Sequence, residues 1–264
     1  MILSKVKSFL FNHLPQILWI GILNLKKSYE FKVNKVKNNI YKVQFESSVL
    51  YISRPKRLFK YKSGYKSRML EIQDKYFISE ISFNHEDIVI DCGSNIGELP
   101  LAIESMSNKH LRVIAIEPDP IEFEVLKLNL DKSAIHLNFF LSNVSSISQA
   151  LYNNDSGDSH LISIGETGRN LRKSFPILTR TLDDLILTLN LISIKLIKIE
   201  VEGFEAEVLQ GGRRVLEITQ YVTVDSGPEK NGSYTFNGVN TILVKAGFKL
   251  IRNNQGLSAL FAKL

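Results

Sequence analysis

The sequence has a single cysteine and no long hydrophobic run. Because Cys92 is alone among 264 residues, an intramolecular disulfide framework and a cysteine-based zinc site are excluded, and the chain fits a reducing compartment. The apolar run at residues 17–23 is far shorter than the roughly 20 residues that span a bilayer. With 44% hydrophobic and 23% charged residues, the composition is that of an average globular protein. Collagen-like, disordered and multi-span membrane classes are therefore excluded.

Acidic residues are scarce in the first third of the chain. Residues 1–86 contain 16 Lys and Arg against 6 Asp and Glu, a net charge of +10, whereas residues 87–264 contain 17 against 21, a net charge of −4. Such a basic part suits phosphate, a membrane surface or an acidic substrate, and charge alone does not distinguish among them. We expect two parts, a basic N-terminal extension over residues 1–85 and a larger domain over residues 86–264.

The extension is expected to hold a helix and a β-hairpin. Polar residues interrupt the apolar stretch at 9–25, as in a helix that packs on the domain, on a second subunit or, through Trp19, at a membrane surface. No small-residue cleavage site of a secretory signal follows it. Residues 40–45 and 49–53 read as two short strands. The expectation is a cytoplasmic protein whose N-terminal helix is a candidate for peripheral membrane contact.

Residues 54–68 contain seven Lys and Arg and no acidic residue, interleaved with Phe59, Tyr61 and Tyr65. Basic residues between aromatics can follow a nucleic-acid backbone and stack bases, so an RNA-binding protein or RNA methyltransferase is one alternative function. The other interpretation is a solvated loop and helix whose lysine stems cover apolar surface. One basic stretch is weak support for nucleic acid, which is therefore the less favoured partner.

From residue 87 apolar strands alternate with helical stretches, which predicts a parallel α/β sheet. Helices are expected up to residue 107, over 121–130, over 204–216 with an interruption at Gly211 and Gly212, and over 235–246. Strands are expected at residues 87–91, 112–117, 135–141, 194–201, 221–225, 248–252 and 257–262, the last two as a closing hairpin.

The turn after the first of these strands is a candidate ligand site. A glycine turn before a helix lets a ligand approach the backbone and presents free N–H groups. Glu117, at the end of the next strand, lies where a carboxylate can accept both hydroxyls of a ribose. The turn lacks the second glycine that admits a pyrophosphate, and Asp91 suits a cationic ligand such as the methionine part of S-adenosylmethionine better than NAD. The turn reads Asp91-Cys92-Gly93-Ser94-Asn95-Ile96-Gly97.

Four segments resemble the FkbM family of S-adenosylmethionine-dependent methyltransferases. They are VIDCGSNIGE (89–98), VIAIEPDP (113–120), TRTLDDLI (179–186) and IKIEVEGFEAEVLQGG (197–212). The first two are shared by many class I methyltransferases, and the last narrows the resemblance to FkbM. Over roughly residues 85–225, the resemblance implies a class I methyltransferase Rossmann-like sheet of about seven strands, the last antiparallel. It also implies S-adenosyl-L-methionine as cofactor and O-methylation of a sugar, glycan or natural-product-like small molecule.

The resemblance also implies site residues. Glu117 matches the ribose acid, and Asn143 falls where such enzymes place a polar residue near the adenine amine. Asp119 is expected to begin the next helix. Glu200 stands where the family usually carries aspartate, and Asp225 where it often carries glutamate. The residues that match the cofactor-binding turn are Asp91, Gly93, Asn95 and Gly97, with Ser94 between them.

The strand at 194–201 ends in charged residues. Alternation puts Lys198, Glu200 and Glu202 on one face of a strand that should be apolar. We interpret Glu200 and Glu202 as flanking the methyl-transfer centre, one of them as general base, with Lys198 keeping them ionised or binding substrate. The alternative is a lysine–glutamate pair, with Glu202 and Glu205 capping the next helix.

The segment 142–175 is rich in Ser, Asn and Gly and is expected to be an irregular lid over the strand ends. His160 within it is a candidate base, although a loop histidine is more often only solvated. Two acids without clustered histidines are weak support for Mg²⁺, so no metal is predicted. A peripheral-membrane protein with a vestigial cofactor site is the third alternative, and the intact turn argues against it. The sequence leaves the oligomeric state open.

Overall fold

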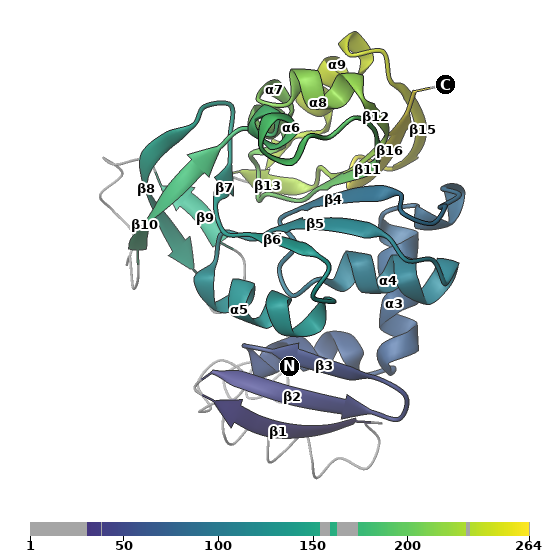
Figure 1. The fold of residues 1–264 in the computed structure, drawn as a ribbon, viewed down its shortest axis with the longest axis vertical. Coiled ribbons are helices and arrows are strands. Elements are labelled where there is room, and N and C mark those ends of the chain that lie inside the picture. Colours follow the sequence, from purple (N-terminus) through teal and green to yellow (C-terminus); the bar gives the residue numbers. More distant parts are fainter. Residues whose placement is uncertain (1–30, 38, 154–158, 163–173, 231–232, 264) are drawn as a thin grey trace, which may run out of the picture. The chain divides into compact units, whose positions relative to one another are not determined.

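The computed structural model describes residues 31–37, 39–153, 159–162, 174–230 and 233–263 (Figure 1). The chain divides into two compact units, unit 1 (Met1–Arg68) and unit 2 (Met69–Leu264). The boundary expected after residue 85 differs from this division by the segment 69–85, which belongs to unit 2. The helix expected at 9–25 lies outside the described residues. Among the helices that the structure describes, none is both long enough and apolar enough to cross a membrane.

Unit 1 contains a three-stranded antiparallel sheet followed by a 3-10 helix. The strands are β1 (Phe31–Lys37), β2 (Ile40–Phe45) and β3 (Val49–Ile52), and the helix is η1 (Pro55–Tyr61). The expected hairpin is confirmed as β2 and β3, and β1, which was not expected, pairs with β2. Alternation along β1 and β2 buries Phe31, Val33, Val43 and Phe45.

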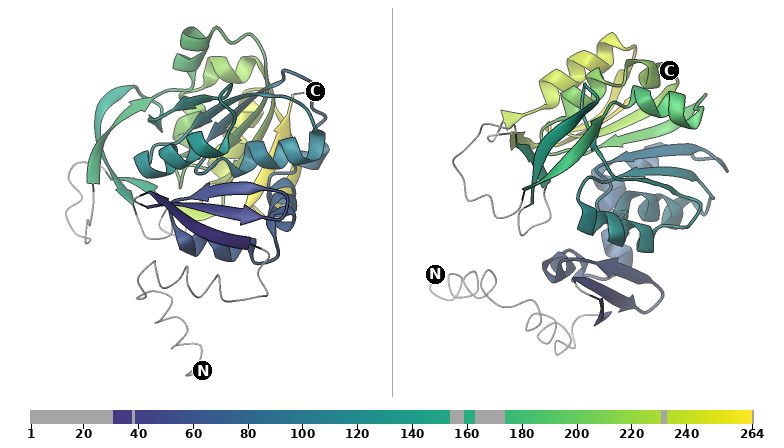
Figure 2. Two further views of the ribbon diagram at one scale, coloured as in Figure 1. Left: turned by 60° about the horizontal axis from the view of Figure 1, so that its bottom comes forward. Right: turned by 60° about the vertical axis from the view of Figure 1, so that its left-hand side comes forward.

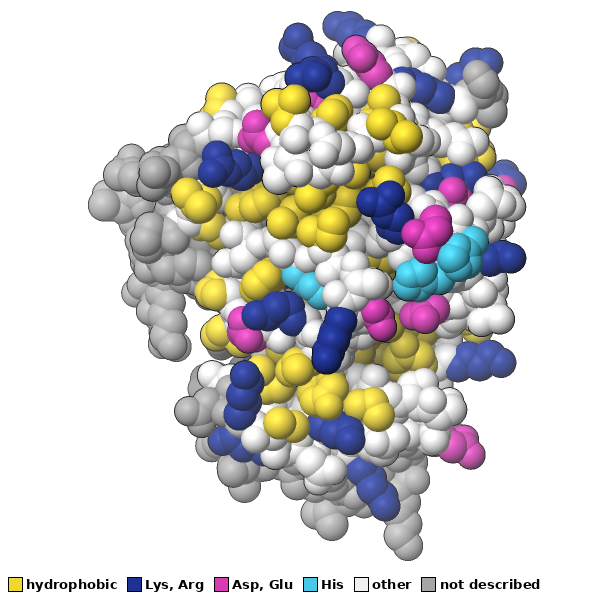
Figure 3. Space-filling model, in the orientation of Figure 1, with side chains coloured by type: hydrophobic (Ala, Val, Ile, Leu, Met, Phe, Trp, Pro, Cys, Tyr) yellow, Lys and Arg dark blue, Asp and Glu magenta, His cyan; other side chains and the backbone are white. Residues whose placement is uncertain are grey.

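Two aromatic residues of the basic segment, Tyr61 and Tyr65, pack against Phe45 in unit 1. The ring of Tyr61, which is fully buried, lies 5.5 Å from that of Phe45, and the ring of Tyr65 lies 5.4 Å from it. Tyr61 is therefore not available to stack on a nucleic-acid base. Residues 31–68 include eleven Lys and Arg against one acidic residue. In the lower part of Figure 3, dark blue Lys and Arg side chains lie beside yellow hydrophobic ones. What this segment offers a partner is mainly charge.

Unit 2 is built around a seven-stranded sheet with the order β15-β16-β12-β11-β4-β5-β6 (Figure 1). All neighbouring strands are parallel except β16, which is antiparallel to both β12 and β15. This confirms the expected α/β sheet with an antiparallel last strand. The strands are β4 (Ile88–Cys92), β5 (Arg112–Ile116), β6 (Ile135–Leu137), β11 (Ile194–Ile199), β12 (Thr219–Asp225), β15 (Lys249–Asn254) and β16 (Ser258–Ala262).

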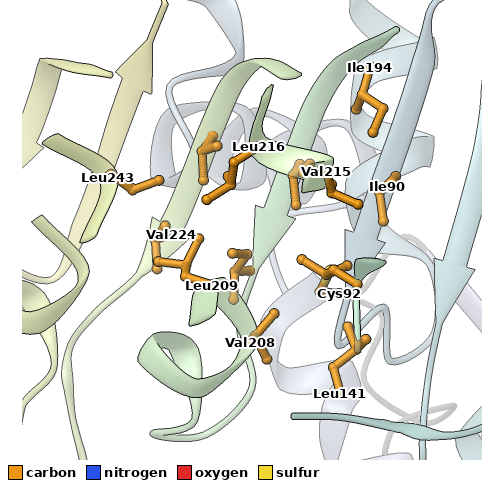
Figure 4. Close-up of a cluster of buried hydrophobic side chains, with 14 of the residues drawn as sticks. Ile90, Cys92, Leu141, Ile194, Val208, Leu209, Val215, Leu216, Val224 and Leu243 are labelled. Atoms are coloured by element: carbon orange, nitrogen blue, oxygen red, sulfur yellow. The ribbon is translucent and has the colours of Figure 1, made fainter. Parts of the chain in front are cut away.

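Helices cover both faces of this sheet (Figure 2). One face carries α4 (Glu98–Ser107) and α5 (Pro120–Asn129), and the other carries α6 (Asp183–Leu189), α7 (Glu205–Gln210), α8 (Arg213–Glu217) and α9 (Phe236–Lys245). The break expected at Gly211 and Gly212 separates α7 from α8. Cys92 lies in the core between the sheet and the second set of helices, with Ile90, Val208 and Leu209 (Figure 4). Burial raises the pKa of its thiol, as expected for a packing residue.

The segment before the sheet is α3 (Tyr65–Lys75), followed by the short 3-10 helix η2 (Ile78–Glu80). Hydrogen bonds within unit 2 fix the end of α3. Gln73 Nε2 donates to the carbonyl of Ala102 in α4 at 2.8 Å, and Thr223 Oγ1 in β12 donates to the carbonyl of Tyr76 at 3.0 Å. Lys75 and Tyr76 are thereby held close to β12.

Two local predictions are wrong. The strand expected over 135–141 is broken, because the Nδ2 of Asn138 donates to the carbonyls of Glu117 at 2.8 Å and Pro118 at 3.1 Å, and the chain leaves the sheet. The segment 142–175 is not wholly irregular, because it contains strands, the first of them over residues 146–153, where Ile147 and Tyr152 are residue types that favour strands. With β7 (Phe140–Leu141), three strands build a second sheet of order β7-β10-β8-β9, namely β8 (Ser146–Asn153), β9 (Ser159–Ile162) and β10 (Ser174–Arg180). A short hairpin, β13 (Pro228–Lys230) and β14 (Ser233–Tyr234), follows β12.

Candidate active site

The predicted turn joins β4 to α4 at the carboxyl edge of the main sheet, where open α/β folds bind their ligands. The backbone N–H groups of Gly93 and Ser94 donate to the carbonyl of Ile116 at 3.0 and 2.9 Å. Ser94 Oγ donates to the carbonyl of Asp91 at 2.7 Å and accepts from the N–H of Ile116 at 3.0 Å. The side chain of Ser94 is buried in these contacts, so it shapes the turn and ties it to β5.

The two glycines of the turn leave space for neighbouring atoms of the same chain. Gly93 has a φ of +75°, and a Cβ at this position would lie 1.9 Å from the carbonyl oxygen of Glu200. Gly97 has a φ of +87°, and a Cβ there would lie 2.9 Å from Cδ2 of Leu130. Both glycines are therefore required by the left-handed backbone and by close packing, one against the end of β11 and one against the residue that follows α5.

Glu117 lies against the turn, as the sequence predicted. Its Oε2 accepts from the N–H of Asn95 at 2.7 Å, and its Oε1 accepts from the N–H of Asp119 at 2.8 Å. Burial, with the negative charges of Asp119 and Glu122, raises the pKa of this carboxyl to about 8, although the two N–H donors oppose the shift. Each carboxylate oxygen has a second lone pair, so the group can still accept ribose hydroxyls.

Asn95 and Asp91 carry buried oxygen atoms that the rest of the structure leaves without a hydrogen bond. Within the part of the chain that is described, Asn95 Oδ1 and Asp91 Oδ2 have no hydrogen-bond partner. Buried polar atoms are nearly always satisfied, so a bound ligand or ordered water is expected at both. Asp119 behaves as expected, since its side chain accepts from the N–H groups of Ile121 and Glu122 and caps α5.

Asn143 lies elsewhere. Its side chain is exposed, and its Nδ2 donates to Oε1 of Gln210 at the end of α7 at 3.3 Å. In the described structure, its hydrogen bonds are with Ser142 and Gln210, not with the residues of the turn. The structure therefore joins Glu117 and Asn95 to the turn, and Asn143 to α7.

A cluster of charged residues lies at the carboxyl ends of β4, β11 and β12. Lys198 Nζ lies 3.1 Å from Asp91 Oδ1 and 3.3 Å from Glu200 Oε2. Lys75 Nζ lies 2.7 Å from both Glu200 Oε1 and Asp225 Oδ2, and so bridges two strand ends. The hydroxyl of Tyr76 donates to Glu200 Oε2 at 2.6 Å. We call Asp91, Lys198, Glu200, Lys75, Tyr76 and Asp225 the charged network.

The network has a closed end and an open end. The side chains of Asp91 and Lys198 are 1% and 3% exposed, whereas those of Glu200 and Lys75 are 34% and 38% exposed. Lys198 Nζ also donates to the carbonyl of Gly93 at 2.7 Å, which fixes the turn. The closed end can therefore orient the turn, while the open end can meet a substrate.

The surroundings of each carboxyl set its pKa. Burial alone would raise the pKa of Glu200, but Lys198 and Lys75 outweigh burial and hold it well below its ordinary value. Burial and then the negative charge of Glu200 raise the pKa of Asp225, and Lys75 only partly opposes them. The same pair of strand ends thus holds a strongly acidic carboxyl and a weakly acidic one.

The other predicted catalytic residues are placed differently. β11 ends at Ile199, and Glu202 lies in the following turn with a φ of +54°, so the alternation expected to join it to Lys198 and Glu200 stops before it. Glu205 Oε1 accepts from the N–H groups of Val201 and Gly203, as in the capping alternative. His160 lies in β9, a strand whose side chains are outside the described structure.

Sequence reasoning missed Lys75 and Tyr76. Lys75 is the last residue of α3 and Tyr76 follows it, in a stretch without a motif that was assigned to the N-terminal extension, and Lys75 is 125 positions from Glu200. Within the described residues, no group of three His, Cys, Asp or Glu side chains is arranged to hold a metal ion. The cations that the carboxylates of the network meet are the two lysines.

Comparisons with known proteins agree with this architecture. A family model described as the methyltransferase FkbM domain matches residues 91–250. The hexuronic acid methyltransferase AglP of Haloferax volcanii is 30% identical over 148 residues, 53% of this chain and 56% of that protein. The chain thus spans about half the length of this curated relative.

Two solved structures are among those with a similar fold. Methyltransferase FkbM from Methylobacillus flagellatus matches with a TM-score of 0.50 and 17% identity, over 79% of this chain and 54% of that chain. A SAM-dependent methyltransferase from Aquifex aeolicus matches with a TM-score of 0.41 and 14% identity, over 76% of this chain and 99% of that chain.

Proposed function

The chain belongs to the FkbM methyltransferase family, and we propose that within it the chain methylates a hydroxyl group of an acidic sugar. It is an S-adenosylmethionine-dependent methyltransferase, and the bound cofactor supplies the methyl group from its sulfonium. The observation that carries the proposed acceptor is the match to a hexuronic acid methyltransferase. The basic charge of unit 1, with eleven Lys and Arg against one acidic residue in 31–68, also favours an acidic acceptor.

The residues at the turn fit the cofactor. S-adenosylmethionine presents ribose hydroxyls and an ammonium as donors and a positive sulfonium, and this edge of the sheet presents acceptors. We assign Glu117 to the ribose, and the unpartnered oxygens of Asp91 and Asn95 to the cationic part. Gly93, Gly97 and Ser94 would act by shaping the turn. Asn143, expected from the sequence near the adenine, is exposed and donates to Gln210, so we assign it no contact with the cofactor.

The acceptor hydroxyl must lose its proton when it is methylated, so a base is required near the open end of the charged network. The candidates from the sequence are Glu200, Glu202 and His160, with Lys198 in support. Of these, Glu200 belongs to the network and is part-exposed at its open end. Catalysis would depend mainly on positioning the hydroxyl in line with the methyl group, plus this proton transfer.

Two measurements test the proposal. Calorimetry with S-adenosylmethionine and S-adenosylhomocysteine should give binding, with NAD as a non-binding control. Transfer of radiolabelled methyl should then be measured to the methyl glycosides of glucuronic and galacturonic acid, with methyl glucoside as the neutral control. Labelling of the uronic acids above the neutral sugar is expected. Labelling of methyl glucoside alone would contradict the acidic acceptor, and labelling of RNA alone would replace the sugar.

A peripheral membrane location stays a prediction. Flotation with vesicles containing anionic lipid, compared between the full chain and a variant lacking residues 1–30, tests it. Equal recovery of both proteins in the vesicle fraction would contradict a role for the N-terminal segment.

A further inference from the structure

The three carboxylates of the charged network are not equally neutralised. Glu200 receives three donors, namely Lys75 at 2.7 Å on Oε1, and Tyr76 at 2.6 Å and Lys198 at 3.3 Å on Oε2. Asp91 faces Lys198 at the closed end, where the side chains are at most 3% exposed. A carboxylate stabilised by two ammonium groups and a phenol is a weak base, and Asp91 is already assigned to the cofactor at the closed end.

Of the two carboxylates that are not sealed from solvent, Glu200 and Asp225, Asp225 has the fewer donors. Its Oδ2 contacts Lys75 at 2.7 Å, and its Oδ1 accepts from the N–H of Gly227 at 3.2 Å. The charged and titratable groups that face it are Lys75 at the end of α3, Tyr76 directly after it, and Glu200 directly after β11. Its side chain is 14% exposed, so a substrate can reach it, and the pair of Lys75 and Glu200 beside it is open as well.

We propose that Asp225 is the general base that removes the proton of the acceptor hydroxyl, and that Lys75 is the positioning residue that holds its carboxylate. The proposal rests on the O-methyl transfer proposed above. Glu200 then has a different role: its carboxylate binds the ammonium of Lys75 and does not accept the proton. The raised pKa of the Asp225 carboxyl is consistent with this division, because a base must bind the proton it receives.

The step balances in atoms and charge. The acceptor oxygen forms its bond to the methyl carbon while the bond from that carbon to sulfur breaks, with its electron pair remaining on sulfur. The hydroxyl proton passes to the carboxylate of Asp225. One positive charge on sulfur and one negative charge on Asp225 therefore disappear together. With all groups ionised, the two lysines and three carboxylates of the network carry a net charge of −1, and protonation of Asp225 makes the network neutral. The reaction therefore creates no new pair of opposite charges at the low-dielectric edge of the sheet.

The first test does not depend on an acceptor. Carboxyl carbons of aspartate are labelled with ¹³C, and the resonance of Asp225 is assigned as the one lost in Asp225→Asn. The expected result is titration above the ordinary aspartate pKa of about 3.9, and a further rise in Lys75→Met, because a neighbouring cation has been removed. Titration of Asp225 at or below about 3.9 in the wild-type chain would overturn the assignment.

The second test uses turnover with a uronic acid glycoside. Asp225→Asn is expected to lower kcat by about 100-fold or more, and to remove the acid limb of the kcat–pH profile, with the Kd for S-adenosylmethionine within about threefold of wild type. Glu200→Gln should retain an acid limb, and Asp131→Asn, an exposed carboxylate beyond α5, should match wild type. A kcat for Asp225→Asn within threefold of wild type, or an unchanged acid limb, would overturn the proposal. If wild type binds cofactor and labels no sugar, the proposed acceptor fails, whereas the assignment of the base is still overturned by a titration of Asp225 at or below about 3.9.

Discussion

Gly93 lies so close to Glu200 that a Cβ at position 93 would sit 1.9 Å from the carbonyl oxygen of Glu200. The cofactor turn and the strand end that carries the network thus fit together only because residue 93 has no side chain. The backbone of Gly93 also lies in the left-handed region, with a φ of +75°. The position of the turn and that of Glu200 are therefore coupled through one backbone contact.

Replacement of Gly93 by alanine should consequently destabilise unit 2. Left-handed backbone and a clash with a backbone atom together are expected to lower the free energy of unfolding by more than about 2 kcal/mol. Gly238→Ala is the matched control. Gly238 lies in α9, where alanine favours the helix, and its Cβ would lie at an ordinary contact distance of 3.9 Å from the Cβ of Ala206. Urea unfolding of both variants tests this. Equal stability of the two variants would contradict the role of the contact.

Glu117 should make cofactor binding depend on pH. Burial raises the pKa of its carboxyl to about 8, so at neutral pH the group is largely protonated, whereas ribose hydroxyls donate best to the ionised form. Affinity for S-adenosylhomocysteine should therefore increase as pH rises from 6 to 8, with release of a proton on binding. Calorimetry in buffers of different ionisation enthalpy measures this, and adenosine, which has no amino acid part, removes the contribution of the ligand's amine. A pH dependence that persists unchanged in Glu117→Gln would contradict the assignment.

The carboxyl of Glu117 should also make stability depend on pH, and here the stabilising contribution decreases as pH rises, whereas cofactor affinity increases. An acid whose folded-state pKa lies above its unfolded value of about 4.5 binds its proton more tightly when folded. Its contribution is fully present below pH 4.5 and is lost as pH rises towards 8, by an amount on the order of a few kcal/mol. Comparison of wild type with Glu117→Gln by urea unfolding at pH 5 and pH 8 checks the sign. If the free energy of unfolding fell less in wild type than in Glu117→Gln between pH 5 and pH 8, the predicted sign would be wrong.

Much of the fold could be predicted from local sequence, and the reason is physical. Buried parallel strands are nearly continuous apolar runs, and the glycine turn marks where β4 gives way to α4. The prediction was wrong at 135–141, where one side-chain amide, that of Asn138, takes the chain out of the sheet. It was also wrong for 142–175, where a composition rich in Ser and Asn concealed the strands β8, β9 and β10.

The candidate site could be predicted only where it is local. Lys198 and Glu200 were found because two charges in an apolar strand are anomalous, but Glu202 was grouped with them by an alternation that its φ of +54° ends. Lys75 belongs to the network through contacts with residues more than a hundred positions away, and its own surroundings in the sequence contain no motif. Partners of this kind are revealed by the fold alone.

Changes of side-chain length at Glu200 and Asp225 should have coupled effects on kcat, because both carboxylates bind the one ammonium of Lys75 at 2.7 Å. Glu200→Asp and Asp225→Glu each move a carboxylate by roughly one carbon–carbon bond, about 1.5 Å. Each single variant is expected to lose about tenfold in kcat, and the double variant to recover to within about threefold, a coupling inside the usual range for residues in contact. The double variant exchanges the two residue types between positions 200 and 225. Additive losses in the double-mutant cycle would show that Lys75 does not link them.

Asn95 and Asn143 were both expected from the sequence to bind cofactor, and the structure separates them. Asn95 Oδ1 is buried and without a hydrogen-bond partner among the described residues, beside a backbone N–H that donates to Glu117, whereas the amide of Asn143 is exposed and donates to Gln210. Asn95→Gly keeps the left-handed φ of +50° accessible and removes only the amide, so its effect reports the contact and not backbone strain. It should weaken binding of S-adenosylhomocysteine about tenfold, the value of one hydrogen bond to a buried group, while Asn143→Ala should change it by less than about threefold. If calorimetry instead gave the larger loss for Asn143→Ala, the ligand would have to lie along α7 and not at the turn.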